Sequence, residues 1–339
     1  MSVRLPFQES FASFDDQNTW FISDFAIGAN FIDTAWSADH VITSPGQVTL
    51  ELDGEDALGK RFTGAEIQTR DEYFYGRYEV VMRPSDEPGV LSSFFVYTGA
   101  PFGDPTSEID FEFIGGDTTK VLLTFHTPLG SDGVFVDLGF DAALSDHTYT
   151  FDWGPNSIRW YADGVLLREV IDPAIGIPAV QGKIFSSIWT GSSAFTGVAD
   201  PNVQTTADYS SITYTPRAEP VANDDTYNLS ENTTSALKVL DNDYALDTGN
   251  LTIALASQPI NGTAIVSAST GEILYTPDLG FVGTDSFDYS ITDANGTWTA
   301  TVSAIVYRGD PIAPGADLLT EGDDDVVLTS GADFVDGLA

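Results

Sequence analysis

Apolar and polar residues alternate over short stretches along most of the chain, and long helical periodicity is absent. Residues 76–84, GRYEVVMRP, alternate as a half-buried strand does, whereas residues 90–99, VLSSFFVYTG, form the nearly continuous apolar run of a buried strand. Alternation returns in residues 107–115, SEIDFEFIG. Further strands are expected at residues 119–127, 147–155, 157–169 and 183–191. The pattern predicts an all-β chain.

A two-residue turn signal divides one of these stretches into a hairpin. In residues 161–167, YADGVLL, Asp163 and Gly164 are residue types that accept the positive φ angles of such a turn. Strands repeated at this spacing, with turns between them, favour a sandwich of two antiparallel sheets.

The texture of the sequence changes near residue 217. Residues 215–226, TPRAEPVANDDT, contain two prolines and no apolar periodicity, which is typical of a domain boundary. Beyond it the expected strands are shorter, and turn pairs such as Asn261-Gly262 and Asn295-Gly296 separate them. This pattern is typical of an immunoglobulin-like sandwich, although the Cys and Trp hallmarks are absent. The predicted organisation is a large domain at 1–217, a smaller sandwich at 218–308 and an Asp/Gly-rich tail at 309–339.

Charge and composition narrow the classes of partner. The net charge is −38, from 13 Lys+Arg against 51 Asp+Glu, so the chain is expected to repel nucleic acid and anionic membranes. The acidity fits either solubility in a salty medium or calcium binding, because calcium prefers carboxylate oxygens. Cysteine is absent, no run of 18 apolar residues is present, and the first residues, MSVRLPFQESFASFDD, lack the apolar run of a secretory signal.

Three carboxylates occupy alternate positions of one predicted strand. Glu108, Asp110 and Glu112 share one face because side chains of a strand alternate, and the other face carries Ile109 and its apolar neighbours Phe111 and Phe113. The apolar face is expected in the core, so the acidic face meets water or a ligand. Like charges at adjacent same-face positions are destabilising. Function is therefore the expected cause.

A metal site and the hydrolysis of a glycosidic bond are the two chemistries that suit this strand. The carboxyl groups of retaining glycosidases lie about 5–5.5 Å apart, and those of inverting enzymes roughly 6.5–9.5 Å apart. The Cα atoms of Glu108 and Glu112 are expected about 13 Å apart, and leaning side chains can reach either range. The spacing therefore leaves both outcomes open. The charge of Asp110 is expected to raise the pKa of whichever neighbour holds a proton.

The strand and its surroundings resemble glycoside hydrolase family 16. The family signature is Glu, apolar, Asp, apolar, Glu, and residues 107–121, SEIDFEFIGGDTTKV, match it in the form typical of lichenases. The ordered matches around it are GRYEVVMRP, SSFFVYTG, DLGFD, HTYTFDW, IRWYADG and GKIFSSIW. The similarity covers roughly residues 7–216, which implies a complete β-jelly-roll domain.

The resemblance implies a retaining endo-β-glucanase that cleaves β-1,4 bonds adjacent to β-1,3 bonds. Glu108 would be the nucleophile, Glu112 the general acid/base and Asp110 the assisting carboxylate. The substrate-binding positions that the resemblance implies are Glu66, Phe95, Tyr97, His126, Trp189 and Phe195. Core packing is an alternative for the aromatic members. His126 stands where lichenases place a tyrosine, and Phe195 would replace a sugar-stacking tryptophan.

Several positions depart from the lichenase pattern. Ala26 and Gly28 stand where lichenases carry a Tyr and an Asn, Thr106 replaces a Trp, and Gln68 replaces an Arg. These changes leave the exact substrate open. The segments AEIQTR and GKIF also resemble the branch that cleaves succinoglycan, an acidic bacterial exopolysaccharide. The chain's negative charge would repel such a polymer, although salt screens that repulsion.

The C-terminal part resembles the cadherin-like or immunoglobulin-like modules of large secreted bacterial proteins. The resemblance rests on residues 222–247, ANDDTYNLSENTTSALKVLDNDYALD, and residues 271–296. The tail, with SGADFVDGLA, resembles the start of a glycine-aspartate calcium repeat of the RTX type, which implies type I secretion and an extracellular location. Candidate calcium ligands are Asp224, Asp225, Asp241 and Asp243, with turn-forming aspartates as the alternative. In the first domain, Ser210 aligns with the aspartate that would ligate the family's structural calcium, so none is assumed there.

The sequence thus favours a secreted, monomeric endo-β-glucanase that acts on a polysaccharide, needs no cofactor for catalysis and carries a spacer module. A depolymerase of an exopolysaccharide such as succinoglycan is the alternative substrate class. Two alternatives of other classes are a carbohydrate-binding or adhesive protein without catalysis and a calcium-dependent structural fragment.

Overall fold

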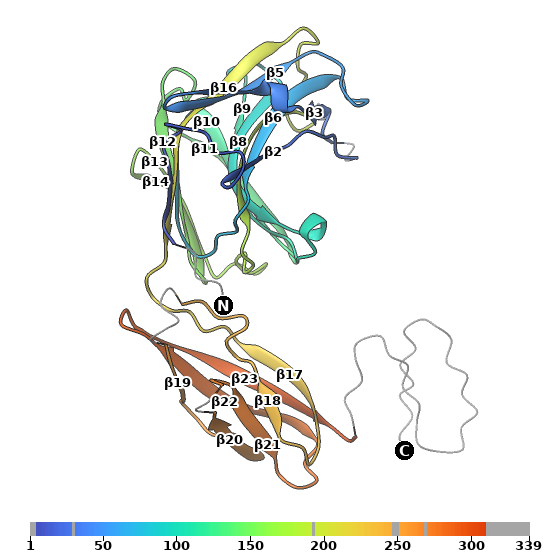
Figure 1. Ribbon diagram of the computed structural model, residues 1–339, viewed down its shortest axis with the longest axis vertical. Helices are drawn as coiled ribbons and strands as arrows, with labels where there is room; N and C mark the ends of the chain where they lie inside the picture. Colours follow the sequence, from blue (N-terminus) through green and yellow to red (C-terminus); the bar gives the residue numbers. More distant parts are fainter. Residues whose placement is uncertain (1–4, 29–30, 192–193, 246–250, 268–269, 310–339) are drawn as a thin grey trace, which may run out of the picture. The chain divides into compact units, whose positions relative to one another are not determined.

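The computed structural model describes residues 5–28, 31–191, 194–245, 251–267 and 270–309. The chain divides into two compact units between Ala218 and Glu219, next to the boundary predicted at residue 217 (Figure 1). Each unit has its own sheets and its own core, and each is described by itself. Among the described residues, no helix has the length and apolar character needed to cross a bilayer.

The first unit consists of one long curled sheet folded into two layers. The inner layer contains, in spatial order, β11 (Gly130–Asp137), β10 (Lys120–Thr127), β9 (Ser107–Ile114), β8 (Val90–Thr98), β15 (Lys183–Thr190) and β6 (Phe62–Thr69), with the short β2 (Trp20–Ile22) beside β6. All of its ladders are antiparallel. Side chains alternate across this layer, so one face is available for a site and the other for a core.

The outer layer closes the sandwich on the other side of the core. Its strands in spatial order are β5 (Gln47–Asp53), β16 (Gln204–Pro216), β7 (Gly76–Arg83), β12 (His147–Trp153), β13 (Ser157–Ala162) and β14 (Val165–Ile171). Short strands extend the curled sheet: β4 (Val41–Ser44) pairs with β5 and β1 (Phe7–Glu9) with β16 in the outer layer, and β3 (Thr34–Trp36) pairs with β6. Strand β6 pairs with both β15 and β5, which joins the two layers. Two 3₁₀ turns, η1 (Ala38–His40) and η2 (Ala100–Phe102), complete the unit.

The expected all-β sandwich is confirmed, including the hairpin between β13 and β14. Asp163 has φ 46° and Gly164 has φ 78°, as a two-residue turn of this type requires. Strand β11 was not predicted, because nearly all of its residues are exposed and no apolar face marks it. Strand β16 was also not predicted, because serine and threonine interrupt its apolar positions.

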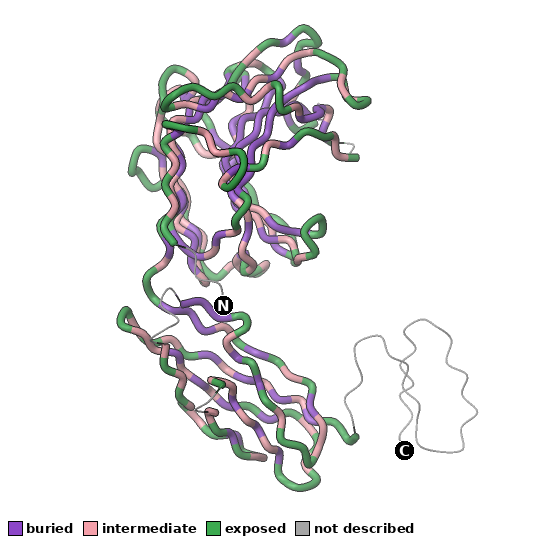
Figure 2. Tube along the Cα trace, in the orientation of Figure 1, coloured by how far each residue is buried: buried purple, intermediate pink, exposed green. Residues whose placement is uncertain are grey.

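The core between the layers holds the apolar face of β9, as the sequence predicted. Figure 2 shows that buried residues run along the strands of this unit. Ile109, Phe111 and Phe113 are fully buried. Tyr149 of β12 packs against two of them, with ring centroids 5.6 Å from Phe111 and 4.7 Å from Phe113. Each buried phenylalanine contributes about 1.5–3 kcal/mol of transfer free energy. This packing fixes the orientation of β9 and turns its acidic face outward from the core.

The second unit is a smaller sandwich of two sheets. One sheet contains β17 (Asp225–Ser230), β23 (Thr297–Tyr307), β22 (Gly283–Thr292) and β19 (Thr252–Leu255), and the other contains β18 (Ser235–Leu237), β21 (Ile273–Pro277) and β20 (Gly262–Val266). Tyr275 and Phe287 stack in its core, with ring centroids 5.9 Å apart. The architecture agrees with the immunoglobulin-like module expected from the sequence. The predicted tail lies, from residue 310 onward, outside the described residues.

A buried tyrosine connects the outer layer to the strands of the inner one. The hydroxyl of Tyr209, on β16, donates to the main-chain oxygens of Ser93 on β8, 2.9 Å away, and Ser187 on β15, 3.3 Å away. We expect Tyr209→Phe to reduce the free energy of unfolding by about 1–2 kcal/mol, because it leaves buried carbonyls without this donor. Urea unfolding followed by tryptophan fluorescence measures the loss. Tyr307→Phe, at an exposed tyrosine of the second unit, is the matched control, and equal midpoints for the two variants would contradict the assignment.

Candidate active site

Antiparallel register arranges the inner face of the sheet into rows that cross four or five strands. The row of Glu112 continues through Ser93 and Ser187 to Glu66, so it runs from β9 across β8 and β15 to β6. The row of Asp110 contains Thr124, Phe95, Phe185 and Gln68, and the row of Glu108 contains His126, Tyr97 and Lys183. Sequence positions far apart in the chain therefore form one surface.

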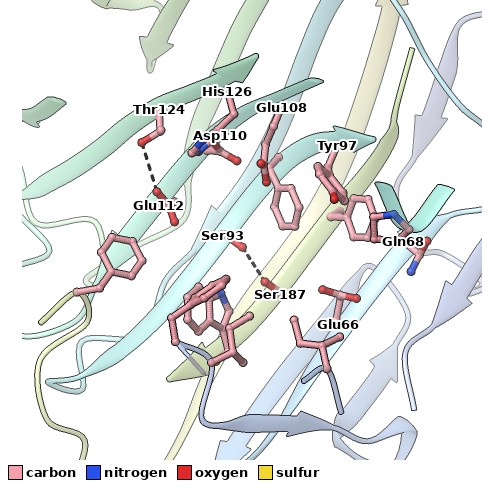
Figure 3. A pocket seen from close by; sticks show the side chains of 18 of the residues that line it. Glu66, Gln68, Ser93, Tyr97, Glu108, Asp110, Glu112, Thr124, His126 and Ser187 are labelled. Carbon is pink, nitrogen blue, oxygen red and sulfur yellow. Dashed lines mark hydrogen bonds and ion pairs between the residues drawn. The ribbon is translucent and has the colours of Figure 1, made fainter. Parts of the chain in front are cut away.

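This surface is the floor of a cleft of about 640 Å³. All three acids of β9 line it, together with Glu66 at the far end of the Glu112 row (Figure 3). Neighbouring strands lie about 4.8 Å apart, so three strand spacings place Glu66 about 14 Å from Glu112. The cleft is thus longer than a single sugar ring, and its polar groups are distributed along its length.

Asp110 is buried from water, and Glu108 and Glu112 are half-buried, although all three face the cleft. Asp110 is only 4% exposed, and its Oδ2 atom has no hydrogen-bond partner among the described residues. The Nε2 atom of His126 lies 3.6 Å from that oxygen. The Oγ1 atom of Thr124 donates to Oε2 of Glu112 across 3.4 Å. Each of these contacts comes from β10, the strand that pairs with β9 on the side away from β8.

Burial raises the pKa of every acid in this group. It raises the pKa of Glu108 to about 8, with repulsion from Glu112 as a second cause, and that of Glu112 to about 7. The pKa of Asp110 is raised well above its usual range by burial and then by repulsion from both glutamates. Because the three groups interact, the protons leave the trio one after another, and each apparent pKa belongs to the group. The site can therefore hold one glutamate ionised and another protonated near neutral pH.

Asp110 stands at the centre of this titration. We expected its negative charge to interact with its neighbours, and repulsion between Asp110 and both glutamates is present, with burial as the larger cause of its raised pKa. Asp110 is the most deeply buried of the three. The reason is its central position, with a glutamate on each side along the strand and Phe95 opposite it on β8.

Glu66 forms a separate polar point in the cleft. Its Oε1 atom accepts a hydrogen bond of 2.6 Å from the Ser23 hydroxyl. Burial raises the pKa of Glu66 to about 7, against the lowering effect of that hydrogen bond. Between Glu66 and Glu112, the hydroxyls of Ser93 and Ser187 bond to each other across 2.7 Å. This row offers several groups that can bond sugar hydroxyls.

Aromatic side chains form the apolar part of the cleft. Phe95 stacks on Phe185 with ring centroids 4.8 Å apart and an interplanar angle of 9°, so the two rings support each other across β8 and β15. Tyr97 meets Phe102 of η2 edge to face at 6.0 Å. Aromatic surfaces of this kind bind the apolar faces of sugar rings and leave the hydroxyls to polar neighbours.

Trp189 lines the cleft but is largely a core residue. It is 8% exposed and packs with Trp36 in a small buried cluster, which agrees with the core alternative as well as with the cleft lining. Its exposed aromatic neighbours are Phe31, with 55% of its surface accessible, and Phe195, with 39%. These two rings present more surface to a ligand than Trp189 does.

Comparison with known proteins decides the family. Residues 29–211 match the description "Glycosyl hydrolases family 16", and residues 217–305 match "Bacterial Ig domain". The chain belongs to glycosyl hydrolase family 16. A β-glucanase of Bacillus amyloliquefaciens is 42% identical over 196 residues, which are 57% of this chain and 78% of that protein. A β-glucanase of Bacillus subtilis is 42% identical over 175 residues, 51% of this chain and 70% of that protein.

Solved structures agree with this assignment. A prokaryotic β-1,3-1,4-glucanase (lichenase) from a mouse hindgut metagenome superposes with a TM-score of 0.59 at 36% identity and covers 62% of this chain and 99% of its own. The β-glucanase of Bacillus licheniformis gives a TM-score of 0.58 at 36% identity, covering 62% and 98%. The first unit of this glycosyl hydrolase therefore has the jelly-roll architecture of lichenase.

All nine of the predicted catalytic and substrate-binding residues of this hydrolase line the cleft; they are Glu66, Phe95, Tyr97, Glu108, Asp110, Glu112, His126, Trp189 and Phe195. Gln68, which replaces an Arg of the lichenase pattern, also lines it. Sequence reasoning missed Ser93, Phe185 and Ser187, although strand alternation from Phe95 and Trp189 could have found them. Phe31 and Phe102 lie outside strands, where no periodicity marks them.

The predicted calcium ligands lie in the second unit. Asp224 accepts a main-chain hydrogen bond from Thr301, and Asp243 accepts one from the hydroxyl of Tyr289, 2.9 Å away. Asp225 and Asp241 line a cavity beside Asp224. The described residues contain no group of three or more His, Cys, Asp or Glu side chains arranged around one metal position. Calcium binding by this unit remains a prediction of the sequence.

The raised pKa of Glu108 predicts a pH-dependent stability of the hydrolase unit. The folded-state pKa exceeds that of an unfolded glutamate, so the stabilising contribution is complete below about pH 4.5 and is lost as pH rises through about 8. We expect Glu108→Gln to exceed wild type in free energy of unfolding by on the order of 2 kcal/mol at pH 9, and to differ little at pH 4.5. Urea unfolding at both pH values measures this difference. Glu79→Gln, on β7 outside the cleft, is the matched control, and an equal difference at both pH values would contradict the prediction.

Proposed function

We propose that this hydrolase is a retaining endo-β-glucanase that cleaves β-1,4 bonds in mixed-linkage β-1,3-1,4-glucan. The observation that carries the proposal is the placement of Glu108 and Glu112 on one strand face in the floor of an extended cleft. The relatives named β-glucanase and the lichenase structures support the substrate class. The extent of the cleft across five strands supports cleavage within a chain rather than at its end.

The two glutamates divide the reaction between them. In the first step, the Glu108 carboxylate attacks the anomeric carbon while the bond from that carbon to the departing oxygen breaks, and Glu112 gives its proton to this oxygen. In the second step, Glu112 takes a proton from water, the water oxygen bonds to the anomeric carbon, and the ester to Glu108 breaks. Two displacements on one carbon return its original configuration.

The surroundings favour ionisation of only one of the two glutamates at a time. Repulsion between the two glutamates opposes ionisation of both, so the ionised nucleophile helps to keep the proton on the acid. Thr124 fixes the acid by its hydrogen bond to Glu112. Asp110, which keeps its proton, adds little negative charge beside the nucleophile. The developing positive charge on the sugar is then stabilised mainly by Glu108.

The location and the role of the second unit are also part of this proposal. We propose that the enzyme acts outside the cell and that the immunoglobulin-like unit is a spacer that can bind calcium. The resemblance of the tail to RTX repeats supports export by type I secretion, although residues 310–339 lie outside the described residues. The enzyme is proposed to act as a monomer on its polysaccharide.

A panel of purified polysaccharides tests the substrate. We expect reducing ends to be released from barley β-glucan and lichenan and not from cellulose, because the cleft is proposed to select a β-1,3 bond beside the cleaved β-1,4 bond. Products are identified by mass, and Glu108→Gln protein serves as the blank. Cleavage of succinoglycan in place of the mixed-linkage glucans would replace the proposed substrate by the acidic exopolysaccharide.

Substitution of each glutamate tests its role. We expect Glu108→Gln to lower kcat by roughly 10³-fold or more with little change in oligosaccharide binding, because the amide cannot act as the nucleophile. Glu112→Gln should lose activity on glucan but still release the leaving group of an aryl glycoside in a first-turnover burst, because that leaving group needs no proton, whereas the following hydrolysis of the ester is slow. Glu79→Gln should match wild type. Turnover by Glu108→Gln close to that of wild type would refute the assignment of the nucleophile.

A further inference from the structure

His126 is the only basic side chain among the described residues that line the cleft. It shares that cleft with four carboxyl groups: Glu66, Glu108, Asp110 and Glu112. The chain has only three histidines, and each faces an aspartate. The pairs of His40 with Asp53, 3.0 Å apart, and of His147 with Asp163, 2.7 Å apart, involve no residue of the cleft lining. The His126 pair alone lies among the candidate catalytic acids.

Side chains of β10 lean along β9, so that each contacts the residue two positions beyond its partner in the register. His126 is paired in register with Glu108, yet its Nε2 atom is directed at Asp110, 3.6 Å from Oδ2. Thr124 is paired with Asp110, yet its hydroxyl bonds Glu112. Figure 3 shows His126 and Asp110 side by side above these strands. The lean gives Asp110 and Glu112 a partner on β10 and leaves Glu108 without one, so Glu108 is free to face a substrate.

The contact with His126 offsets the cost of burying the Asp110 carboxyl group. Oδ2 of Asp110 is buried without a hydrogen bond, and an ionised carboxylate in that position would carry a large desolvation penalty. A distance of 3.6 Å is slightly longer than a hydrogen bond, and catalytic contacts often shorten when substrate binds. An imidazole there can accept a proton from the acid or donate one to the carboxylate.

We propose that His126 and Asp110 share one proton as a pair of zero net charge, and that this pairing keeps Glu108 ionised toward acidic pH. The inference rests on the proposed role of Glu108 as the nucleophile. His126 is then a positioning residue, since it acts through Asp110. The His126 ring differs from the carboxyl groups of the cleft because it becomes positive when it binds a proton, whereas a carboxylate becomes neutral.

The other charged or titratable groups around the His126 ring are placed less favourably than Asp110 to share a proton with it. Strand β9 presents Glu108 and Glu112, β8 presents Tyr97 opposite Glu108, and β15 presents Lys183 two strands away from β9. On β11, the residue opposite His126 is Ser131, which does not titrate, and Asp132 faces the other way and pairs with Arg168. Burial lowers the pKa of His126 and raises that of Asp110, so the two groups approach each other in proton affinity.

The net charge of the His126–Asp110 pair determines whether the pKa values of the two glutamates rise or fall when His126 is replaced. Without the ring, Asp110 loses the group that shares its proton and ionises at lower pH. The added negative charge beside Glu108 and Glu112 raises the pKa of both glutamates. Both limbs of the pH profile of kcat/KM then move to higher pH. A shift of about 0.5–1 unit corresponds to about a 3–10-fold loss of kcat/KM on the acid side of the profile.

Nuclear magnetic resonance of histidine-labelled protein tests the pair without any turnover. The three ring signals are assigned with the variants His126→Gln and His147→Gln, on the full chain. We expect Asp110→Asn to lower the pKa of the His126 ring by about one unit, because a carboxylate stabilises the protonated ring, and to leave His40 and His147 unchanged. An unchanged titration of His126 in Asp110→Asn would overturn the proposal.

Kinetics test the consequence for catalysis, on whichever polysaccharide wild type cleaves. We expect His126→Phe and His126→Gln to move both limbs of kcat/KM to higher pH, and His147→Gln to follow wild type. Profiles of the His126 variants that superpose on wild type, or a higher KM with unmoved limbs, would overturn the proposal and leave His126 as a sugar contact only. If Glu108→Gln retains turnover, the nucleophile assignment fails while the magnetic resonance result still decides the pair.

Discussion

The desolvation of three like carboxyl groups on one face of a strand is the constraint on which this structure depends. Desolvation opposes the ionised forms of Glu108, Asp110 and Glu112, and repulsion adds to it for Glu108 and Asp110. The opposite face of β9 offsets this cost, since Ile109, Phe111 and Phe113 are fully buried against the outer layer. One strand therefore holds both three acids whose ionisation is opposed and three fully buried apolar side chains. Apolar packing on one face of β9 thus holds the three acids of the other face in the cleft.

The scarcity of basic groups makes this balance sensitive to single contacts. The described lining of the cleft holds four carboxyl groups and one histidine. In such a site, the state of each acid is set by burial, by its neighbours and by a few hydrogen bonds, such as that from Ser23 to Glu66 and that from Thr124 to Glu112. These are the means by which enzymes adjust the pKa of an acid to the pH at which it works.

Much of the fold and of the site could be predicted from the sequence, because strand alternation is a strong local signal. The acidic and apolar faces of β9 and the Asp163-Gly164 turn followed from two-residue periodicity and from turn chemistry. Strand β11 could not be predicted, since an exposed edge strand has no apolar face. The rows that bring Glu66 toward the acids depend on register between distant strands, which local patterns do not specify. The burial of Asp110 could not be predicted for the same reason, because it depends on side chains from β8 and β10.

Covalent trapping tests most directly whether Glu108 is the nucleophile. A 2-deoxy-2-fluoro β-glucoside or β-oligoglucoside with a good leaving group slows the second displacement and lets the glycosyl ester accumulate. We expect peptide mass spectrometry to find one sugar adduct, on Glu108, and none on Asp110 or Glu112. An adduct on another residue, or product of inverted configuration without any adduct, would contradict the assignment of Glu108 as the group that attacks the sugar.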